Sequence, residues 1–271
     1  LLSGEGANGK SVILSLVNHL LTPSACSDIT LQNTTEKFGA CRLIGKLSNI
    51  CADIPRKSIE DSGVLKTLIS GDSIYADVKY QQPVSFRNRA KLIFSCNELP
   101  AVIDRSEGFF RRFIIIPFTN TFEPGDGKHD FNILEKLKAE ESMNAFFLKA
   151  LNGLQRLTTN RGFSKCEESE KTVANYRYEN DNIAQFIDEM VTVTEEETKT
   201  YKDDCYAAYR DFCNANGSRP VNSIWFGRRA AIIQPKFKDQ SKEHSGKRYY
   251  TRIHVRKNPT GEDYPNVFKR K

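Results

Sequence analysis

Short apolar runs alternate with longer segments of helical spacing over roughly the first 160 residues of the chain. The apolar runs are brief and continuous, which predicts strands at residues 1–2, 47–53, 91–96 and 113–118. Apolar positions three and four apart predict helices over residues 12–21, 58–70, 130–158 and 164–190. Buried-type strands that alternate with helices are typical of an α/β domain built on a parallel sheet.

One segment in this region has a different pattern. Residues 74–86 contain two alternating stretches joined by Gln81 and Gln82, which predicts a β-hairpin. Its tip is polar and cationic, with Lys79 and Tyr80 next to each other.

The pattern changes again near residue 180. Amphipathic helices are predicted over residues 183–190 and 201–214, and Ser223 can cap a third helix. A polar loop over residues 236–247 then precedes an alternating strand over residues 249–255. Three short helices followed by a hairpin with a basic loop predict a small α+β winged-helix domain.

The third of these helices carries several large apolar side chains. Trp225 and Phe226 share helical spacing with Ile232 and Ile233, so we expect both aromatic side chains in the core.

Composition narrows the class of protein. Of the 271 residues, 39% are hydrophobic and 27% are charged, as in water-soluble globular proteins. No apolar run approaches the roughly 20 residues that span a bilayer, so no membrane segment is expected. The seven cysteines form no C-x-x-C pair, which argues against a disulfide scaffold or a structural zinc site and favours a reducing cytosol.

Positive charge is concentrated towards the C-terminal end. Residues 199–271 contain 17 Lys and Arg side chains against 7 Asp and Glu, whereas the whole chain carries a net charge of only +6. The asymmetry predicts that this segment meets a polyanion; a solvated basic surface is the alternative.

Residues 4–11 read G-E-G-A-N-G-K-S and fit G-x-x-x-x-G-K-[ST], the phosphate-binding P-loop. The motif lies between the first predicted strand and the first predicted helix, where backbone N–H groups and the helix dipole attract phosphate. Lys10 is expected to contact the β- and γ-phosphates, and the Ser11 hydroxyl to bind Mg²⁺. The predicted ATP-binding residues are Gly4, Glu5, Gly6, Ala7, Asn8, Gly9, Lys10 and Ser11.

Three later strand boundaries carry polar side chains. Asp53 ends the strand over residues 47–53 and is predicted to hold Mg²⁺ as a Walker B acid, with an ordinary exposed Asp as the alternative. Asn97 follows residues 91–96, where an amide can orient the attacking water and sense the γ-phosphate; a turn Asn is the alternative. Arg111 and Arg112 precede residues 113–118. One of them, with Arg112 favoured, is predicted to be an arginine finger for a neighbouring subunit's nucleotide rather than part of a surface ion pair.

These motifs follow one another in an order that resembles a known module. Residues 4–11, 47–55, 91–100 and 108–118, together with Lys66 and the tripeptide Ser70-Gly71-Asp72, look like the superfamily 3 helicase module of phage, plasmid and poxvirus primase-helicases. The resemblance covers roughly residues 1–160. Residues 180–256 are similar to the winged-helix domain that often follows this module.

The resemblance implies an AAA+-like ATPase that uses ATP and Mg²⁺, assembles as a homo-hexameric ring and moves 3′→5′ along single-stranded DNA. It also implies a primase or primase-polymerase domain upstream, which agrees with a chain that begins inside a predicted core strand.

The resemblance further places a DNA-contacting hairpin at residues 74–86, so Lys79 and Tyr80 are predicted to supply a phosphate contact and a stacking face. In the winged-helix segment the predicted DNA contacts are Arg228, Arg229, Lys247 and Arg248, with Arg252 nearby. Many winged helices bind protein instead, and that alternative stays open.

One departure from the family concerns the Walker B motif. Many members have two adjacent acids, whereas Ala52 precedes Asp53 here. The carboxylate that polarises the attacking water is therefore open between Glu5, Glu60 and Asp61.

The predicted organisation is an ATPase domain over residues 1–160, a helical linker over 161–180, a winged-helix domain over 181–256 and a tail over 257–271. The predicted function is that of an ATP-dependent DNA helicase in the replication of a phage, plasmid or mobile element, in the cytoplasm of a bacterial host.

Two other functions compete with the helicase. A P-loop NTPase of another class, such as a small-molecule kinase, leaves Arg111, Arg112 and the basic C-terminal segment unexplained. A DNA-binding or initiator module in which the nucleotide is structural is favoured by the single Walker B acid.

Overall fold

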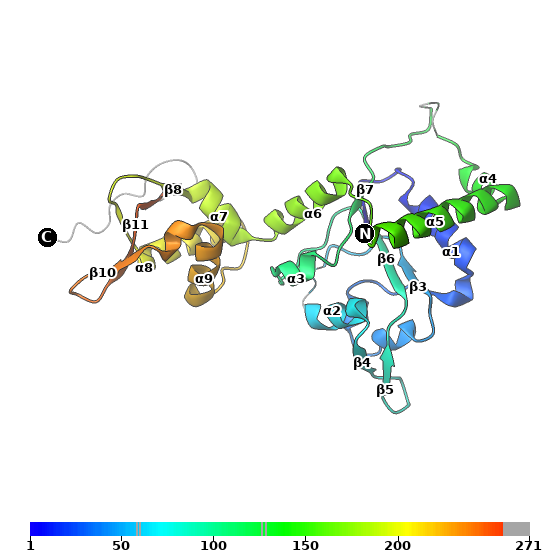
Figure 1. Cartoon of the computed structure of the whole chain (residues 1–271), viewed down its shortest axis with the longest axis horizontal. Coiled ribbons are helices and arrows are strands. Elements are labelled where there is room, and N and C mark those ends of the chain that lie inside the picture. The colour runs from blue at the N-terminus through cyan, green and yellow to red at the C-terminus, as the bar shows by residue number, and fades with distance from the viewer. Residues whose placement is uncertain (58, 60, 126, 128, 257–271) are drawn as a thin grey trace. The chain divides into compact units, whose positions relative to one another are not determined.

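The computed structural model describes the whole chain except residues 58, 60, 126, 128 and 257–271. The chain divides into two compact units, Leu1–Arg177 and Tyr178–Lys271 (Figure 1). The predicted tail over residues 257–271 lies outside the described residues. Within the described part, no helix is long and apolar enough to cross a membrane.

Unit 1 is built on a five-stranded sheet in which every strand pairing is parallel. Its strands are β1 (Leu2–Ser3), β2 (Cys26–Ser27), β3 (Ser48–Cys51), β6 (Lys91–Cys96) and β7 (Ile116–Pro117). Their order is β2-β3-β6-β1-β7. The predicted α/β class with a parallel sheet is confirmed. The strand predicted over residues 113–118 is shorter than expected, and the two-residue strand β2 was not predicted.

Six helices surround this sheet among the described residues of unit 1. They are α1 (Lys10–Leu21), α2 (Ser62–Ser70), α3 (Glu107–Phe110), α4 (Ile133–Lys138), α5 (Glu140–Asn160) and α6 (Glu167–Glu179). The helical character predicted over residues 130–158 is confirmed, with a break at Ala139, whose extended backbone with ψ 144° separates α4 from α5. Short 3₁₀ turns lie at Pro23–Ala25, Asn33–Thr35 and Ala40–Leu43.

The α6 helix lies within the predicted linker but contributes to the core of unit 1. Tyr176 is 2% exposed, and its hydroxyl donates a hydrogen bond of 2.6 Å to the carbonyl of Pro100. Its ring packs edge-on against Phe110, with ring centroids 5.5 Å apart. The last turns of α6 therefore fix the segment that follows β6.

The predicted hairpin is present as β4 (Ser73–Ala76) and β5 (Val84–Arg87), which pair antiparallel. It follows α2 directly and projects from the body of unit 1 (Figure 1). At its tip Tyr80 is 93% exposed, and the Lys79 Nζ atom lies 5.1 Å from the centre of its ring.

Over its described residues, unit 2 combines three helices with two small antiparallel sheets. The helices are α7 (Asn182–Met190), α8 (Lys202–Ala215) and α9 (Ser223–Ile233), and a 3₁₀ turn follows at Pro235–Lys238. The strands are β8 (Val191–Val193), β9 (Lys199–Tyr201), β10 (Gln240–Lys242), β11 (Arg248–Thr251) and β12 (Ile253–Val255). They form the sheets β10-β11-β9 and β12-β8.

Two predicted elements of this region are divided in the structure. The region predicted as helical over residues 164–190 contains α6 and the separately predicted helix over residues 183–190, now α7; the Asp181 carboxylate caps α7 by accepting hydrogen bonds from the N–H groups of Ile183 and Ala184. The strand predicted over residues 249–255 is interrupted by Arg252, whose φ of 58° lies in the left-handed region.

An aromatic cluster fills the core of unit 2. Phe186, Tyr209, Phe212, Phe226 and Phe237 are each at most 2% exposed. Tyr209 and Phe226 are stacked, with ring centroids 4.6 Å apart. The expectation for Trp225 is wrong, because its side chain is 62% exposed. Phe226 and Ala230 form the buried face of α9, and Trp225 and Ile232, seven residues apart, lie on the solvent face.

Candidate nucleotide-binding site

The loop that joins β1 to α1 has the backbone that a phosphate-binding loop requires. Gly4 has a φ of 151°, and a Cβ atom there would collide with the carbonyl of Phe118. Gly9 adopts the left-handed conformation, with a φ of 86°, immediately before α1 begins at Lys10. Glycine is needed at both positions, so the spacing of the motif follows from the turn.

The Lys10 side chain is folded into this loop and is 4% exposed. Its Nζ atom donates hydrogen bonds to the carbonyls of Gly4 at 2.6 Å and Glu5 at 3.1 Å. It also donates to the amide oxygens of Asn8 at 3.0 Å and Asn97 at 3.3 Å. All four acceptors are neutral, so phosphate oxygens would be stronger partners for the ammonium group.

Asp53 and Asn97 come from adjacent parallel strands. Each follows the carboxyl end of its strand, Asp53 after β3 and Asn97 after β6, and both side chains line one cavity with the loop residues. Asp53 has a φ of 51°, and its N–H donates 3.2 Å to the Ser95 hydroxyl in β6. Asp is among the residues that tolerate this conformation, so the backbone turns sharply and carries the carboxylate to the sheet edge.

This cavity has a volume of about 930 Å³ and lies above the loop. The Ser11 hydroxyl and the Asp53 carboxylate both line it, and oxygen donors of this kind are the ligands that Mg²⁺ prefers. The donor set therefore fits a magnesium ion bound together with a nucleotide.

One wall of the cavity was not predicted from the sequence. It is formed by Phe118, Phe122, His129, Asp130 and Ile133. Backbone hydrogen bonds tie it to the site, since the N–H of Phe118 donates to Ser3 at 2.7 Å and that of Phe122 donates to Ala7 at 2.8 Å. These residues lie mainly in irregular segments, and no motif marks them in the sequence.

Two of the three open candidates for the water-polarising carboxylate can be placed. Glu5 is exposed and does not line the cavity. Asp61 caps α2 by accepting a hydrogen bond of 2.8 Å from the N–H of Gly63. Glu60 lies outside the described residues. Asp130 does line the cavity, and hydrogen bonds from Lys136 and from the N–H of Asn132 lower its pKa.

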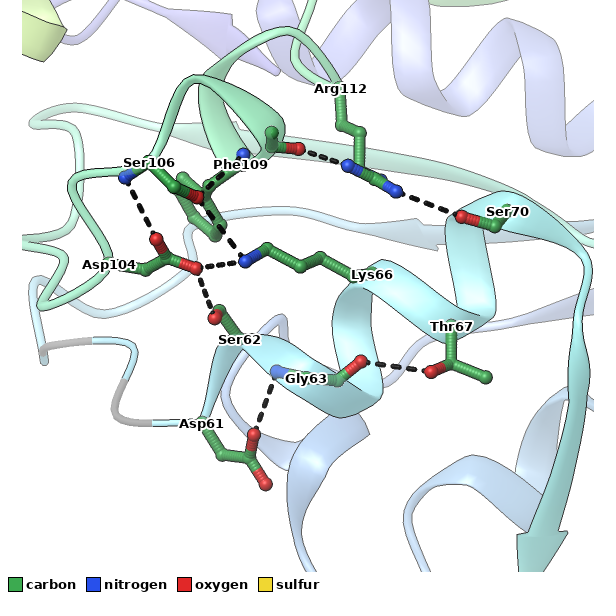
Figure 2. A network of polar contacts seen from close by, with 11 residues as sticks. Asp61, Ser62, Gly63, Lys66, Thr67, Ser70, Asp104, Ser106, Phe109 and Arg112 are labelled. Carbon is green, nitrogen blue, oxygen red and sulfur yellow. Dashed lines mark hydrogen bonds and ion pairs between the residues drawn. The ribbon is translucent and has the colours of Figure 1, made fainter.

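The two candidate finger residues have different surroundings. The Arg112 guanidinium donates to the Ser70 hydroxyl at 3.0 Å and to the carbonyl of Gly108, so α2 and α3 both hold it (Figure 2). Arg111 is exposed, and within the described part of the chain no hydrogen bond or ion pair involves its side chain. Neither arginine lines the cavity of its own chain.

A polar network beside Arg112 joins the same two elements. The Asp104 carboxylate forms an ion pair with Lys66 of α2, accepts a hydrogen bond from the Ser62 hydroxyl, and accepts another of 2.9 Å from the N–H of Ser106 (Figure 2). The Ser106 hydroxyl in turn caps α3 by accepting from the N–H of Phe109. Burial alone would raise the pKa of Asp104, but the hydrogen bonds from Lys66, Ser106 and Ser62 hold it well below its usual range.

The predicted DNA contacts in unit 2 also differ in accessibility. Arg228, Lys247 and Arg248 are exposed. Arg229 instead forms a two-donor ion pair with Asp181, at 3.0 Å and 2.6 Å, and the Asp181 side chain is only 3% exposed. Because Asp181 also caps α7, the pair connects α7 to α9. Arg229 therefore has a structural role that the sequence did not reveal.

Comparison with known protein families matches each unit separately. Residues 2–112 match a family described as "Family of unknown function (DUF5906)", and residues 178–265 match "Poxvirus D5 protein-like".

Three curated proteins are similar to parts of the chain. A "Putative helicase" of Acanthamoeba polyphaga mimivirus is 32% identical over 128 residues, which is 45% of this chain. "Putative helicase 022R" of Frog virus 3 is 26% identical over 235 residues, or 79% of the chain. The "DNA Primase-polymerase" of Nitratiruptor phage NrS-1 is 27% identical over 124 residues, or 44% of the chain. The chain covers only 13%, 24% and 17% of these proteins, respectively.

Two solved structures of the NrS-1 C-terminal region without ligand have a similar fold. Each gives a TM-score of 0.52, at 18% and 16% identity. They match 94% and 93% of this chain, which covers 65% and 66% of theirs. At this identity the likeness concerns the fold alone.

Proposed function

We propose that this chain, a superfamily 3 helicase-like module related to viral proteins named "Putative helicase" and to a phage primase-polymerase, hydrolyses ATP to move along single-stranded DNA. The observation that carries the proposal is the convergence of Lys10, Asp53 and Asn97 on one cavity. Lys10 and Asn97 are 87 positions apart in sequence, yet their side chains are joined by a hydrogen bond of 3.3 Å.

Each of these residues has a proposed role in hydrolysis. The loop N–H groups and Lys10 bind the phosphates of ATP, and Ser11 and Asp53 hold Mg²⁺. When bound, this ion neutralises negative charge on the phosphates. Asn97 orients the attacking water beside the γ-phosphate. Lys10 is the one Lys or Arg side chain among the described residues that line the cavity, so we assign an arginine of a neighbouring subunit to the charge that develops during transfer.

The architecture supports a ring-forming motor. The parallel order β2-β3-β6-β1-β7 places the P-loop strand between β6 and β7, as in AAA+-like ATPases. In unit 2, the succession of three helices and the antiparallel sheet β10-β11-β9 supports a winged-helix domain. We propose a homo-hexamer that moves 3′→5′, in a longer replication protein with a primase or primase-polymerase domain upstream, acting in the cytoplasm of the host cell.

The DNA contact that we propose inside such a ring is the β4–β5 hairpin. Lys79 is exposed beside Tyr80, whose ring is almost fully exposed. A cation next to an accessible aromatic face suits a single strand, because phosphates meet the ammonium group and unpaired bases stack on the ring.

The alternative function is that of an initiator module that binds a nucleotide without hydrolysing it. The chain has one acid at the Walker B position, and neither Glu5 nor Asp61 lines the cavity. A DNA-binding initiator module that holds a nucleotide without turnover would need no further carboxylate.

Steady-state ATP hydrolysis, measured with and without a single-stranded oligonucleotide, separates the two functions. We expect stimulation by DNA in the unaltered chain, and loss of Mg²⁺-dependent hydrolysis with retained nucleotide binding in Asp53→Asn. Asp28→Asn is the control, since that carboxylate lies in an exposed ion pair with Arg42. Nucleotide binding without any turnover in a protein extended upstream would favour the initiator module.

A further inference from the structure

The outer face of the β10-β11-β9 sheet carries two tyrosines side by side. Tyr249 of β11 and Tyr201 of β9 are direct cross-strand partners, so their side chains share one face. Their ring centroids are 6.2 Å apart. The next residue, Tyr250, is on the opposite face and is 3% exposed, whereas Tyr201 and Tyr249 both remain accessible to solvent. We call Tyr201 and Tyr249 the tyrosine pair.

Lysines flank both rings of the tyrosine pair. The Lys199 Nζ atom lies 5.1 Å from the centre of the Tyr249 ring, and the Lys247 Nζ atom lies 5.9 Å from that of Tyr201. Glu243 is the acidic side chain of this face: it accepts a hydrogen bond of 2.8 Å from the Tyr201 hydroxyl and lies 3.7 Å from Lys199.

Further cations gather at the hairpin end of the sheet. Lys242 and Arg248 are direct cross-strand partners, and like charges placed opposite each other destabilise a sheet. Burial and the nearby Arg248 lower the pKa of Lys202. Among the residues that the structure describes, no ion pair joins Lys242, Lys247 or Arg248 to an acidic side chain. Because Arg248 directly precedes Tyr249, the Lys242–Arg248 pair lies on the Tyr250 face of the sheet, opposite the tyrosine pair.

The first segment of unit 2 has the opposite charge. Residues 178–198 contain seven acidic and no basic side chains. Three of the acids, at positions 195–197, precede β9 and so lie at the end of that strand away from Tyr201. Acidic side chains therefore gather in the segment before β9, whereas Lys199 and Lys247 lie beside the tyrosine pair.

We propose that the tyrosine pair is a stacking platform for single-stranded nucleic acid, whose phosphates contact Lys199 and Lys247. Flat rings with adjacent cations suit unpaired bases, because every base has a stacking face and every nucleotide carries a phosphate. A duplex presents no free base faces to such a sheet. The platform extends the proposed function, since it gives the motor a single-strand contact outside the β4–β5 hairpin.

Equilibrium binding without ATP tests this platform. The fluorescent probes are oligothymidylate, oligouridylate and a duplex, all of about 15 nucleotides. The parent protein carries Lys79→Ala and Tyr80→Ala, so that the hairpin does not contribute. We expect Tyr201→Ala and Tyr249→Ala each to raise the Kd for a single strand by about 5- to 100-fold. If the substitutions raise the Kd for oligothymidylate alone, the ligand is DNA. If they raise the Kd for oligouridylate alone, the ligand is RNA.

Two controls separate stacking from structural damage. Tyr249→Phe keeps the ring and should bind like the parent, and Tyr178→Ala removes an exposed tyrosine elsewhere in unit 2. Kd values for Tyr201→Ala and Tyr249→Ala within twofold of the parent, or an equal loss of duplex binding, would overturn the platform.

A crosslinking measurement on the unaltered chain tests the platform even if the variants fail to fold. The unaltered chain is irradiated with an oligonucleotide containing 5-iodouracil, and adducts are expected on Tyr201 or Tyr249; adducts confined to other residues would also overturn the proposal. If single-stranded DNA did not stimulate ATP hydrolysis but still bound through the tyrosine pair, only the proposed motor would be contradicted.

Discussion

At the scale of single residues, Lys10 is the most constrained side chain of the candidate site. Its ammonium group has four oxygen partners and is almost fully buried, yet none of these partners is charged. We predict that Lys10→Ala lowers ATP hydrolysis by at least about 100-fold, because one strong phosphate contact is removed. A coupled phosphate-release assay measures the effect. Lys171→Ala is the matched control, since that lysine is exposed on α6.

The fold should survive this change, because the other loop contacts remain. The amide nitrogen of Asn8 still donates to the carbonyl of Phe118 at 3.2 Å, and the glycine turns do not depend on Lys10. Thermal unfolding of Lys10→Ala should therefore resemble that of the unaltered chain. Hydrolysis at a normal rate in Lys10→Ala would remove the P-loop from the proposed mechanism.

Sequence reasoning placed single residues well where a strand end determined their position. Lys10, Asp53 and Asn97 line one cavity because the carboxyl ends of parallel strands share one edge of the sheet. Their roles stay predictions. The wall around Phe122 could not be predicted, since it depends on where an irregular segment folds back. The ion pair of Arg229 could not be predicted from the sequence either, because Asp181 is 48 positions away.

At the scale of elements, the contact between α2 and α3 depends on the Asp104 network. The side chains of Lys66 and Asp104 are 30% and 18% exposed, whereas those of the Arg42–Asp28 pair are 59% and 80% exposed. We predict that Asp104→Asn lowers the free energy of unfolding by about 1–3 kcal/mol, because the half-buried Lys66 and Ser62 lose a charged acceptor. Asp28→Asn should cost less than about 1 kcal/mol. Urea denaturation of both variants measures the difference.

The same carboxylate predicts how stability depends on pH. The folded state lowers the pKa of Asp104 below its ordinary value of 3.8, so ionised Asp104 stabilises the fold above that pH. This stabilisation is lost as the pH falls from about 3.8 towards the lower pKa of the folded state. In Asp104→Asn this part of the pH dependence should disappear. Unchanged acid sensitivity in the variant would assign it to other carboxylates.

Boundaries of elements were harder to predict than their existence. The break at Ala139 lies inside a segment that was predicted to be helical throughout, so the local pattern did not reveal it. Trp225 shows the related difficulty for burial. Adjacent aromatic residues on a helix lie about 100° apart, and the pattern did not show which of the two faced the core.

At the scale of the whole molecule, positive charge does not follow the division into units. The basic excess of residues 199–271 is largely offset within unit 2 by the acids of residues 178–198. We predict that removing residues 199–271 weakens DNA binding and flattens its salt dependence. Each lost phosphate contact should reduce the log–log salt slope by about 0.9 for duplex and about 0.7 for single strands. Fluorescence anisotropy across a salt series measures both slopes, and an unchanged slope would assign the segment to another partner.

In the proposed ring, an arginine finger acts across the contact between neighbouring subunits. Arg111 is the better candidate finger, because α2 and α3 already hold Arg112 through Ser70 and Gly108. A finger in other NTPases contributes about 10³–10⁵ in turnover. We predict that Arg111→Ala spares ATP binding but loses hydrolysis, and that mixing it with Lys10→Ala subunits restores activity, since an intact P-loop then meets an intact finger. Arg112→Ala should mainly lower the melting temperature. Mixed rings that stay inactive, with assembly confirmed by sedimentation, would contradict a finger at Arg111.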